Sequence, residues 1–320
     1  MIKQQITDDI ILRLEKAIDE GGIPPWSKSW SSGQLAFNAS SGKVYQGINQ
    51  LILGMQPYGD PRYLTYKQAE HMGLQIRRGE HGVRIVKLVE VERKRAKQTA
   101  GTEGEVVAEE NGKALVLKAY TVFNAAQIDG MAPMPARECD VKPAEAVEAI
   151  VWGLQDTGLK LTFGHYQPAY DMRRDEIRIP VAADFYSQED FNSCLVHEMA
   201  HSTANPKRIG RPFFSFGTKE YAREEIRAEL ASSFMGQGLI GLPPSQSMIE
   251  SHASYISSWL EVLRNDKNEI FKAAADAQRI CDYLGERALA AKPRPAKSQA
   301  EDAAPEEVLV VQARSTPLGL

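Results

Sequence analysis

The chain has 320 residues, of which 43% are hydrophobic and 25% are charged, and its formal net charge at pH 7 is −4. These values are typical of a soluble globular protein, and the length allows two domains. No apolar run approaches the length of a membrane span, and the N-terminus lacks the apolar core of a signal peptide. The three cysteines are far apart and odd in number, which excludes a disulfide scaffold and predicts a cytoplasmic location.

The charge is distributed unevenly along the chain. Between Arg62 and Lys97, ten lysines and arginines stand against four acidic residues. A basic block on an otherwise acidic chain indicates a surface that faces a polyanion.

The first third of the chain predicts alternating short helices and strands. Residues 5–20 have apolar side chains at helical spacing and end at "GGIPPW", which predicts an amphipathic helix. "QGINQLILGM" predicts a short buried helix, and "RYLTYKQAEHMG" a strand followed by a helix that closes at Gly73. "IRRGEHGVRIVKLVEVE" predicts a β-hairpin that turns between Gly79 and Gly82.

The next segments predict a break between two domains. Residues 93–113 are charged and glycine-rich, which predicts a mobile loop, and "ALVLKAYTVFNAAQI" then predicts a strand. "DGMAPMPARECDVKP" is rich in proline and predicts a linker. We therefore expect one domain over residues 1–130 and a linker over 131–142.

The second half is expected to be mostly helical, with a small sheet. A helix from Pro143 to Thr157 precedes a β-segment in which "DEIRIP" is the clearest strand, and four helices are expected over 188–203, 219–238, 247–265 and 268–290. This second domain spans 143–291, and the Pro- and Ala-rich residues 292–320 predict a disordered tail. The predicted fold class is α+β, with a mixed first domain.

A metal-binding motif lies within "LVHEMAHST". His197 and His201 are four residues apart, so on a helix they share one face and both reach one ion. Glu198 projects beside them, where it accepts a proton from water and acts as the base of a hydrolase. The pattern predicts Zn²⁺, or another divalent ion such as Mn²⁺.

The third ligand is expected from the helix "YAREEIRAELASSFM". Glu225 and Glu229 lie four residues apart on one face, so one binds the ion and the other supports a ligand histidine from behind. The gluzincin pattern E-x-x-A-[D/N] favours Glu225 as the ligand, but a shift of one turn reverses the two roles. Glu224 is expected to point into solvent.

Other residues near the motif have a functional and a structural interpretation. "DEIRIP" is expected at the edge of the sheet, where a peptide adds by backbone pairing, or it is a plain sheet edge. Tyr255 and His252 are candidate oxyanion donors, or they pack around Trp259. His165 is expected to be structural or exposed.

The N-terminal half alternates aromatic residues with basic and amide residues, as in "PPWSKSW" and "PRYLTYKQ". Aromatic platforms for bases beside cations for phosphates are what a protein that binds single strands requires. Alternatively, the aromatic residues belong to the core and the cations form a solvated face.

Taken together, both halves resemble the ArdC-type antirestriction proteins of conjugative plasmids, from about Ile6 to Leu284. The resemblance is carried by "GGIPPWSKSW", "FNASSGKVYQGIN", "YLTYKQAEHMGLQIRRGEHG", "HEMAHST" and "YAREEIRAELASSF". It implies an N-terminal domain that binds single-stranded DNA without sequence preference, a zincin-like metallopeptidase domain, and protection of incoming plasmid DNA from restriction. On this basis the DNA-binding residues are Trp26, Lys28, Trp30, Lys43, Tyr45, Arg77, Arg78 and Lys87.

Two alternatives remain open at this point. The protein acts purely by binding DNA, with a structural metal site, or it is a regulatory protease that cleaves a repressor or a restriction subunit.

Overall fold

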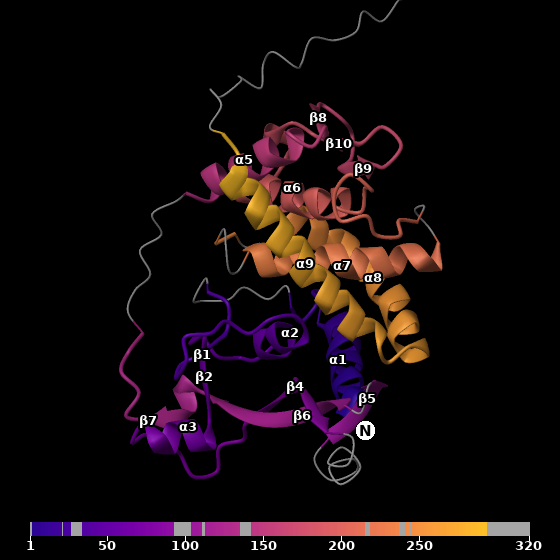
Figure 1. Ribbon diagram of the computed structural model, residues 1–320. Helices are drawn as coiled ribbons and strands as arrows, with labels where there is room; N and C mark the ends of the chain where they lie inside the picture. The colour runs from indigo at the N-terminus through magenta and orange to yellow at the C-terminus, as the bar shows by residue number, and fades with distance from the viewer. Residues whose placement is uncertain are drawn as a thin grey trace, which may run out of the picture.

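The structure is a computed structural model. It describes residues 2–20, 22–26, 34–92, 104–110, 113–134, 142–214, 218–236, 241–242 and 245–292. A sheet-rich N-terminal half lies against a mostly helical C-terminal half that has a small sheet of its own, which confirms the predicted α+β class (Figure 1). No helix in the described ranges is long and apolar enough to cross a membrane. Of the earlier predictions, Lys28, Trp30, most of the linker (135–141) and the tail from residue 293 onward lie outside the described residues.

The N-terminal half is built around a five-stranded sheet. Strands β1 (Phe37–Asn38), β2 (Arg62–Thr65), β6 (Lys113–Asn124) and β4 (Val83–Glu92) lie in that order, and β5 (Gly104–Glu110) also pairs with β6. Helix α1 (Ile2–Asp19) buries its apolar stripe, and α2 (Ile48–Gly54) is almost wholly buried, as predicted. Helix α3 (Tyr66–His71) follows β2 directly, begins at a capping box on Thr65 and closes at Gly73, whose φ is +70°.

Two predictions for this half are wrong. The expected hairpin does not form, because β3 (Gln75–Ile76) pairs with β7 (Ile128–Asp129) while β4 pairs with β6. Within the expected loop, residues 104–110 form strand β5, and the remaining residues 93–103 and 111–112 lie outside the described ranges. The polar sequence of β5 gives little local signal, but Val106 pairs with Val116 and packs in a small apolar cluster on β6.

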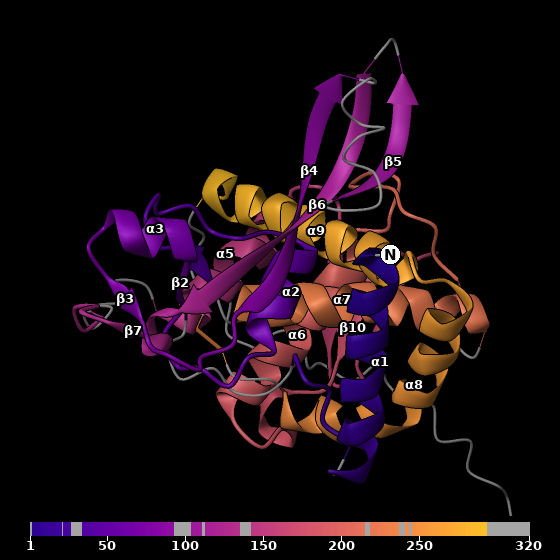
Figure 2. The ribbon, with the colours of Figure 1, turned by 90° about the horizontal axis from the view of Figure 1, so that it is seen from below.

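Strands β4, β6 and β5 form a ribbon that projects from the body of the molecule (Figure 2). At its base, the Asn49 side chain of α2 accepts a hydrogen bond from the backbone N–H of Val86 (2.9 Å) and donates one to its carbonyl (2.7 Å). This side chain caps the open edge of β4, where unpaired backbone groups would otherwise be available to another strand.

The C-terminal half places a three-stranded sheet beside a helical bundle. Helix α5 (Pro143–Gln155) leads to β8 (Lys160–Phe163), β9 (Ala169–Asp171) and β10 (Glu176–Ile179), and helices α6 (Gln188–Ser202), α7 (Lys219–Met235), α8 (Gln246–Asn265) and α9 (Glu269–Ala290) follow. The sheet order is β8-β10-β9. The "DEIRIP" strand, β10, is therefore central and not at the edge, because β8 pairs with it in parallel and β9 in antiparallel orientation.

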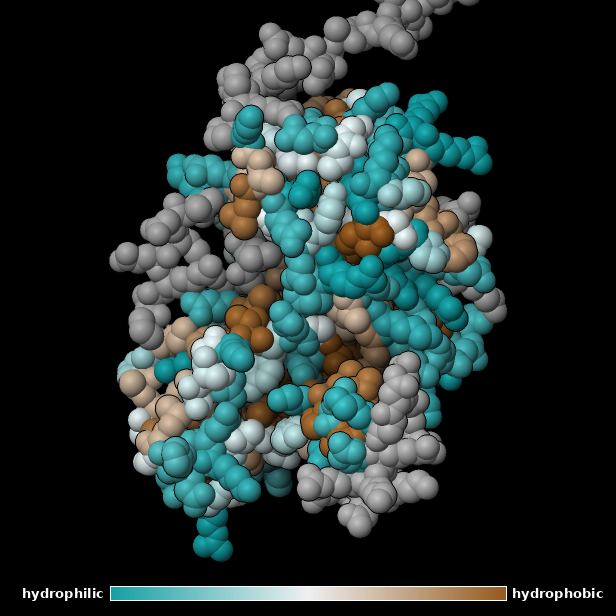
Figure 3. Space-filling view, in the orientation of Figure 1, coloured by the Kyte–Doolittle hydropathy of each residue, from teal (hydrophilic) through white to brown (hydrophobic). Residues whose placement is uncertain are grey.

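The two halves share one hydrophobic core. Side chains of α1 and α2 belong to the same cluster of buried residues as those of α6 to α9. The Trp26 ring lies 5.7 Å from the Trp259 ring, and the Ser233 hydroxyl donates to the carbonyl of Trp26 (2.8 Å). Hydrophilic side chains dominate the helical half on the face in Figure 3, and larger hydrophobic areas appear where the halves meet.

Candidate metal centre

Helix α6 carries the candidate site through the interior of the C-terminal half. It begins at Ser187, whose hydroxyl accepts the backbone N–H of Asp190 (3.1 Å), and it is buried on all sides from Asp190 to Ser202. His197, Glu198 and His201 are only 3%, 7% and 4% exposed. Their polar atoms therefore require partners within the protein or a bound ion.

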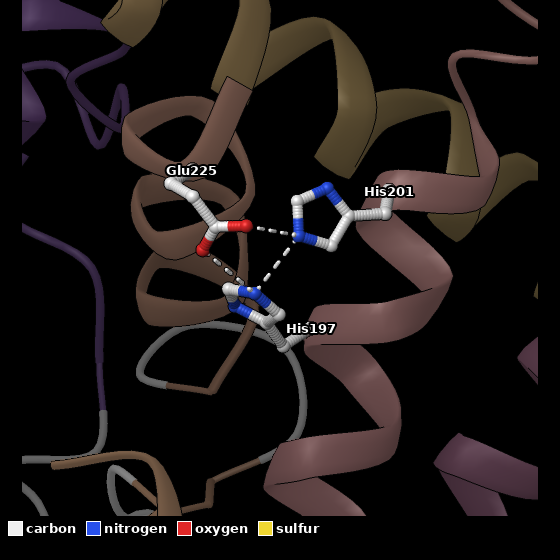
Figure 4. A group of neighbouring side chains, drawn as sticks. All are labelled: His197, His201 and Glu225. Carbon is white, nitrogen blue, oxygen red and sulfur yellow. Dashed lines mark hydrogen bonds and ion pairs between the residues drawn. The ribbon is translucent and has the colours of Figure 1, made fainter. Parts of the chain in front are cut away.

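Helix α7 brings Glu225 against the two histidines. The Nε2 atoms of His197 and His201 lie 3.0 Å apart, and the Glu225 carboxylate oxygens lie 3.6 and 3.2 Å from them (Figure 4). Ligand atoms about 2.1 Å from a shared tetrahedral ion are about 3.4 Å apart, so these separations fit a divalent cation. All three residues are buried, and they form a group able to hold a metal.

A carboxylate stands behind each histidine. Glu224 lies 3.1 Å from Nδ1 of His201, and Glu229 lies 3.7 Å from Nδ1 of His197. Glu224 is within hydrogen-bond distance of Nδ1 of His201, and a carboxylate in that position fixes the ring orientation of a ligand histidine and increases its basicity. Nδ1 of His197 has no hydrogen-bond partner among the described residues, and Glu229 is the carboxylate that faces it. The geometry thus separates the two glutamates that the sequence left interchangeable: Glu225 faces both Nε2 atoms and Glu229 stands behind His197.

The expectation that Glu224 points into solvent is wrong. Its side chain is buried because α7 packs directly on α6, and it forms an ion pair with Arg211. Arg211 also donates to the carbonyl of Ala200 and to the hydroxyl of Thr203, both at 3.0 Å. Arg211 thereby fixes Glu224 against His201.

The electrostatics of the centre favour a bound cation. Burial alone lowers the pKa of His201, but Glu225 and the hydrogen-bonded Glu224 outweigh burial and raise the pKa to about 10. Burial raises the pKa of Glu198, while the neighbouring histidines act to lower it. Glu198 also accepts a hydrogen bond from the backbone N–H of Tyr170 on β9.

Aromatic rings line the centre on the side of α7 and α8. Tyr221 stacks on His201 with a centroid distance of 6.4 Å, and its hydroxyl hydrogen-bonds to Glu225. Tyr255 lies 6.4 Å from Tyr221 and stacks on Trp259 at 6.3 Å.

The role of Tyr255 as an oxyanion donor stays a prediction, and the side chain of His252 lies outside the described residues. His165 lies 2.9 Å from the Thr162 hydroxyl, outside this cluster.

The predicted DNA-binding residues lie on separate elements. Lys43 and Tyr45 follow β1, Arg77 and Arg78 follow β3, and Lys87 lies in the middle of β4. The Tyr45 hydroxyl accepts a hydrogen bond from Asn38, and Arg77 forms ion pairs with Glu80 and Asp129. Lys43, Arg78 and Lys87 are exposed.

Trp26 does not fit its predicted role. Its side chain is 1% exposed, because it packs against Trp259 in the core between the two halves, so no base reaches its ring. This burial contradicts the assignment of Trp26 as a stacking platform for DNA.

The roles of three residues at the centre were not predicted from the sequence. Tyr221 lies four residues before Glu225, and this spacing on one helix face was a usable signal. Glu224 gave a weaker signal as the neighbour of a ligand, and Arg211, which lies between helices, gave none.

Comparison with family models identifies both halves. Residues 1–123 match the N-terminal domain of anti-restriction factor ArdC. Residues 145–276 match a zincin-like metallopeptidase.

Three curated relatives cover most of this chain. Two proteins named DNA primase TraC, both from Escherichia coli, are 36% identical over 301 and 289 residues, which is 88% and 84% of this chain. The chain spans only 27% and 19% of their respective lengths. Uncharacterized protein y4eC of Sinorhizobium fredii is 32% identical over 289 residues, which covers 88% of this chain and 91% of the relative.

Two solved structures of the antirestriction protein ArdC from plasmid R388 share the fold. The metal-free structure is 32% identical with a TM-score of 0.69, and the match covers 91% of this chain and 99% of that one. The Mn(II)-bound structure is 31% identical with a TM-score of 0.70, and the match covers 90% and 98% of the two chains. The chain therefore belongs to the ArdC antirestriction family, with an ArdC N-terminal domain joined to a zincin-like metallopeptidase domain.

Proposed function

We propose that the protein protects incoming conjugative DNA in the cytoplasm of a recipient cell. In this proposal the N-terminal domain binds single-stranded DNA without sequence preference, and the C-terminal domain hydrolyses a peptide bond. The observation that carries the enzymatic part is the buried group of His197, His201 and Glu225 with Glu198 beside it. The match to the ArdC N-terminal domain supports DNA binding.

The chemistry follows from the positions of the side chains. When bound, a divalent ion such as Zn²⁺ or Mn²⁺ acts as a Lewis acid and makes water a nucleophile near neutral pH. His197, His201 and Glu225 would hold this ion. Glu198 takes the proton of the attacking water on its carboxylate as the new C–O bond forms. Glu198 then returns the proton to the leaving amine as the peptide C–N bond breaks.

The peptide substrate has a place to bind beside Glu198. Strand β9 is an edge of the small sheet, and the backbone N–H of Tyr170 points to Glu198 and not into the sheet. A peptide that pairs with the open edge of β9 by backbone hydrogen bonds lies next to the base. The strand proposed to pair with the peptide is therefore β9 and not β10, because β10 is central in the sheet.

Substitution of Glu198 by Gln tests the hydrolytic step. The variant keeps the shape of the side chain but cannot take a proton, so we expect normal folding and normal metal binding together with loss of peptide hydrolysis. Metal binding is measured by calorimetry, and hydrolysis by mass spectrometry of a peptide library. Hydrolysis by the variant at the wild-type rate contradicts the role of Glu198.

The same variant separates the proposal from its alternatives in a conjugation assay against a restricting host. Full protection by Glu198→Gln shows that DNA binding alone protects, and loss of protection shows that proteolysis is required.

DNA binding is tested by titration of labelled single strands at rising salt. For phosphate contacts, the logarithm of affinity falls linearly with the logarithm of salt concentration. A preference for duplex DNA, or no dependence on salt, overturns this part.

A further inference from the structure

One face of the β4–β6–β5 ribbon carries a compact basic and aromatic patch. Lys87 on β4 and Lys118 on β6 are paired directly across the two strands. Tyr120 lies two residues from Lys118, so both side chains point to the same face of the sheet. Lys87 and Tyr120 are exposed and Lys118 is half-buried, and we call these three residues the ribbon patch.

The cross-strand pair of lysines is unfavourable unless an anion lies nearby. Like charges directly opposite each other destabilise a sheet. On β4 and β6 the patch face carries no acidic residue, because Glu90 and Glu92 of β4 point to the other face. In the described part of the chain, neither Lys87 nor Lys118 forms an ion pair, whereas Lys113 on the opposite face pairs with Glu90 at 2.5 Å.

Within the described part of the chain, the neighbouring strands leave the patch open. Lys118 pairs with Lys87 across one edge of β6 and with Gly104 of β5 across the other edge. Gly104 has no side chain to cover the patch. Towards the base, Ile85 and Val122 form one apolar cluster with Leu53, and towards the tip, Ala114 and Val116 form another with Val91 and Val106. The patch lies between these two clusters, where β4, β6 and β5 are paired. The opposite face contributes Val86 and Leu117 to the shared core.

We propose that the ribbon patch is the surface on which the protein binds single-stranded DNA, an inference that rests on the proposed function. Lys87 and Lys118 contact neighbouring phosphates, and the Tyr120 ring stacks on an unpaired base. A sheet surface with exposed aromatic rings is a common platform for unstacked bases, and it is sequence-tolerant because every base has a flat face. A duplex offers no free base to Tyr120.

The test measures fluorescence anisotropy of a labelled oligothymidylate with the full chain. We expect the double variant Lys87→Ala/Lys118→Ala to bind at least tenfold more weakly at low salt. Its salt slope should fall by about 1.4, since each phosphate contact to a single strand contributes about 0.7. Tyr120→Ala should weaken binding about tenfold with an unchanged salt slope, and Tyr120→Phe should restore it, because stacking needs only the ring.

Lys113→Ala is the matched control, because Lys113 lies on the same strand but points to the other face. We expect it to bind as the wild type does, and circular dichroism verifies that each variant is folded. If the wild type binds and the ribbon-patch variants bind equally well, the inference is overturned while the proposed function stands. If the wild type binds no single-stranded DNA, the binding part of the proposed function fails and the inference fails with it.

Discussion

The candidate metal centre includes charged side chains that lie behind the group able to hold a metal. Glu224 and Glu229 each stand behind one histidine, and Arg211 fixes Glu224 by an ion pair within the core. The two histidines and Glu198 could be identified from the sequence, because a spacing of four residues places both rings on one side of any helix. The choice between Glu225 and Glu229 could not, because both share a face of α7, and only the packing angle on α6 decides which carboxylate reaches both Nε2 atoms.

Replacement of Glu224 by Gln tests this supporting layer. The amide retains the size of the side chain but loses the charge that orients His201, so metal affinity should fall about 10- to 100-fold. Isothermal titration with Zn²⁺ and Mn²⁺ measures the change. Glu220→Gln, an exposed substitution in the first turn of the same helix, serves as control. Equal affinities for both variants would show that Glu224 has only a packing role.

At the scale of elements, local pattern predicted the helices well and the strand neighbours poorly. The helices α1 and α9 have clear apolar spacing, and the structure places them, together with α6, within a few residues of the prediction. The pairing of β3 with β7, the central place of β10 and the existence of β5 depend on partners distant in sequence. Lys118 and Tyr120 were likewise overlooked, although their alternation on a predicted strand already placed them on one face.

The turn between β9 and β10 is fastened to the end of α6 through one buried ion pair. Asp175 has a φ of +53° and forms an ion pair with Arg208, whose side chain is fully buried. Arg208 also donates to the carbonyl of Ser202 (2.7 Å) and to the Tyr170 hydroxyl (3.1 Å). The strand that presents the Tyr170 N–H to Glu198 is thus tied to the helix that carries Glu198.

Asp175→Asn tests this connection without straining the backbone, since Asn tolerates positive φ. An uncompensated buried Arg208 should lower the free energy of unfolding by about 2–3 kcal/mol. Although burial acts to raise the pKa of Asp175, Arg208, Tyr170 and Lys207 lower it. The stability from its charge is therefore complete above the unfolded pKa of about 3.9 and is lost as pH falls through the folded pKa. Urea unfolding should give a lower free energy of unfolding for Asp175→Asn than for the wild type at pH 7, and this gap should narrow below about pH 4. A gap that is independent of pH contradicts the ion pair.

At the scale of the molecule, the two halves are joined by their cores. The sequence predicts two domains but not their contact, because Trp26 and Trp259 lie more than two hundred residues apart. A row of ring contacts runs from Trp26 through Trp259, Tyr255 and Tyr221 to His201 in the candidate metal centre. Thr7 of α1 donates to the carbonyl of Lys267, and Arg264 of α8 pairs with Glu15, both at the same interface.

This shared core predicts that the described body unfolds as one unit and that metal bound in one half stabilises the other. A ligand present at about 100 times its dissociation constant adds about 2.7 kcal/mol to the free energy of unfolding. Scanning calorimetry should therefore show a single transition that moves upward with Zn²⁺ or Mn²⁺. Hydrogen exchange should slow equally for the most protected amides of β6 and α6, since both then exchange only through global unfolding. His201→Ala should abolish the metal-induced slowing of exchange in both halves, and Glu198→Gln should preserve it. A shift confined to α6, with β6 unchanged, would show instead that the halves unfold independently despite the continuous core.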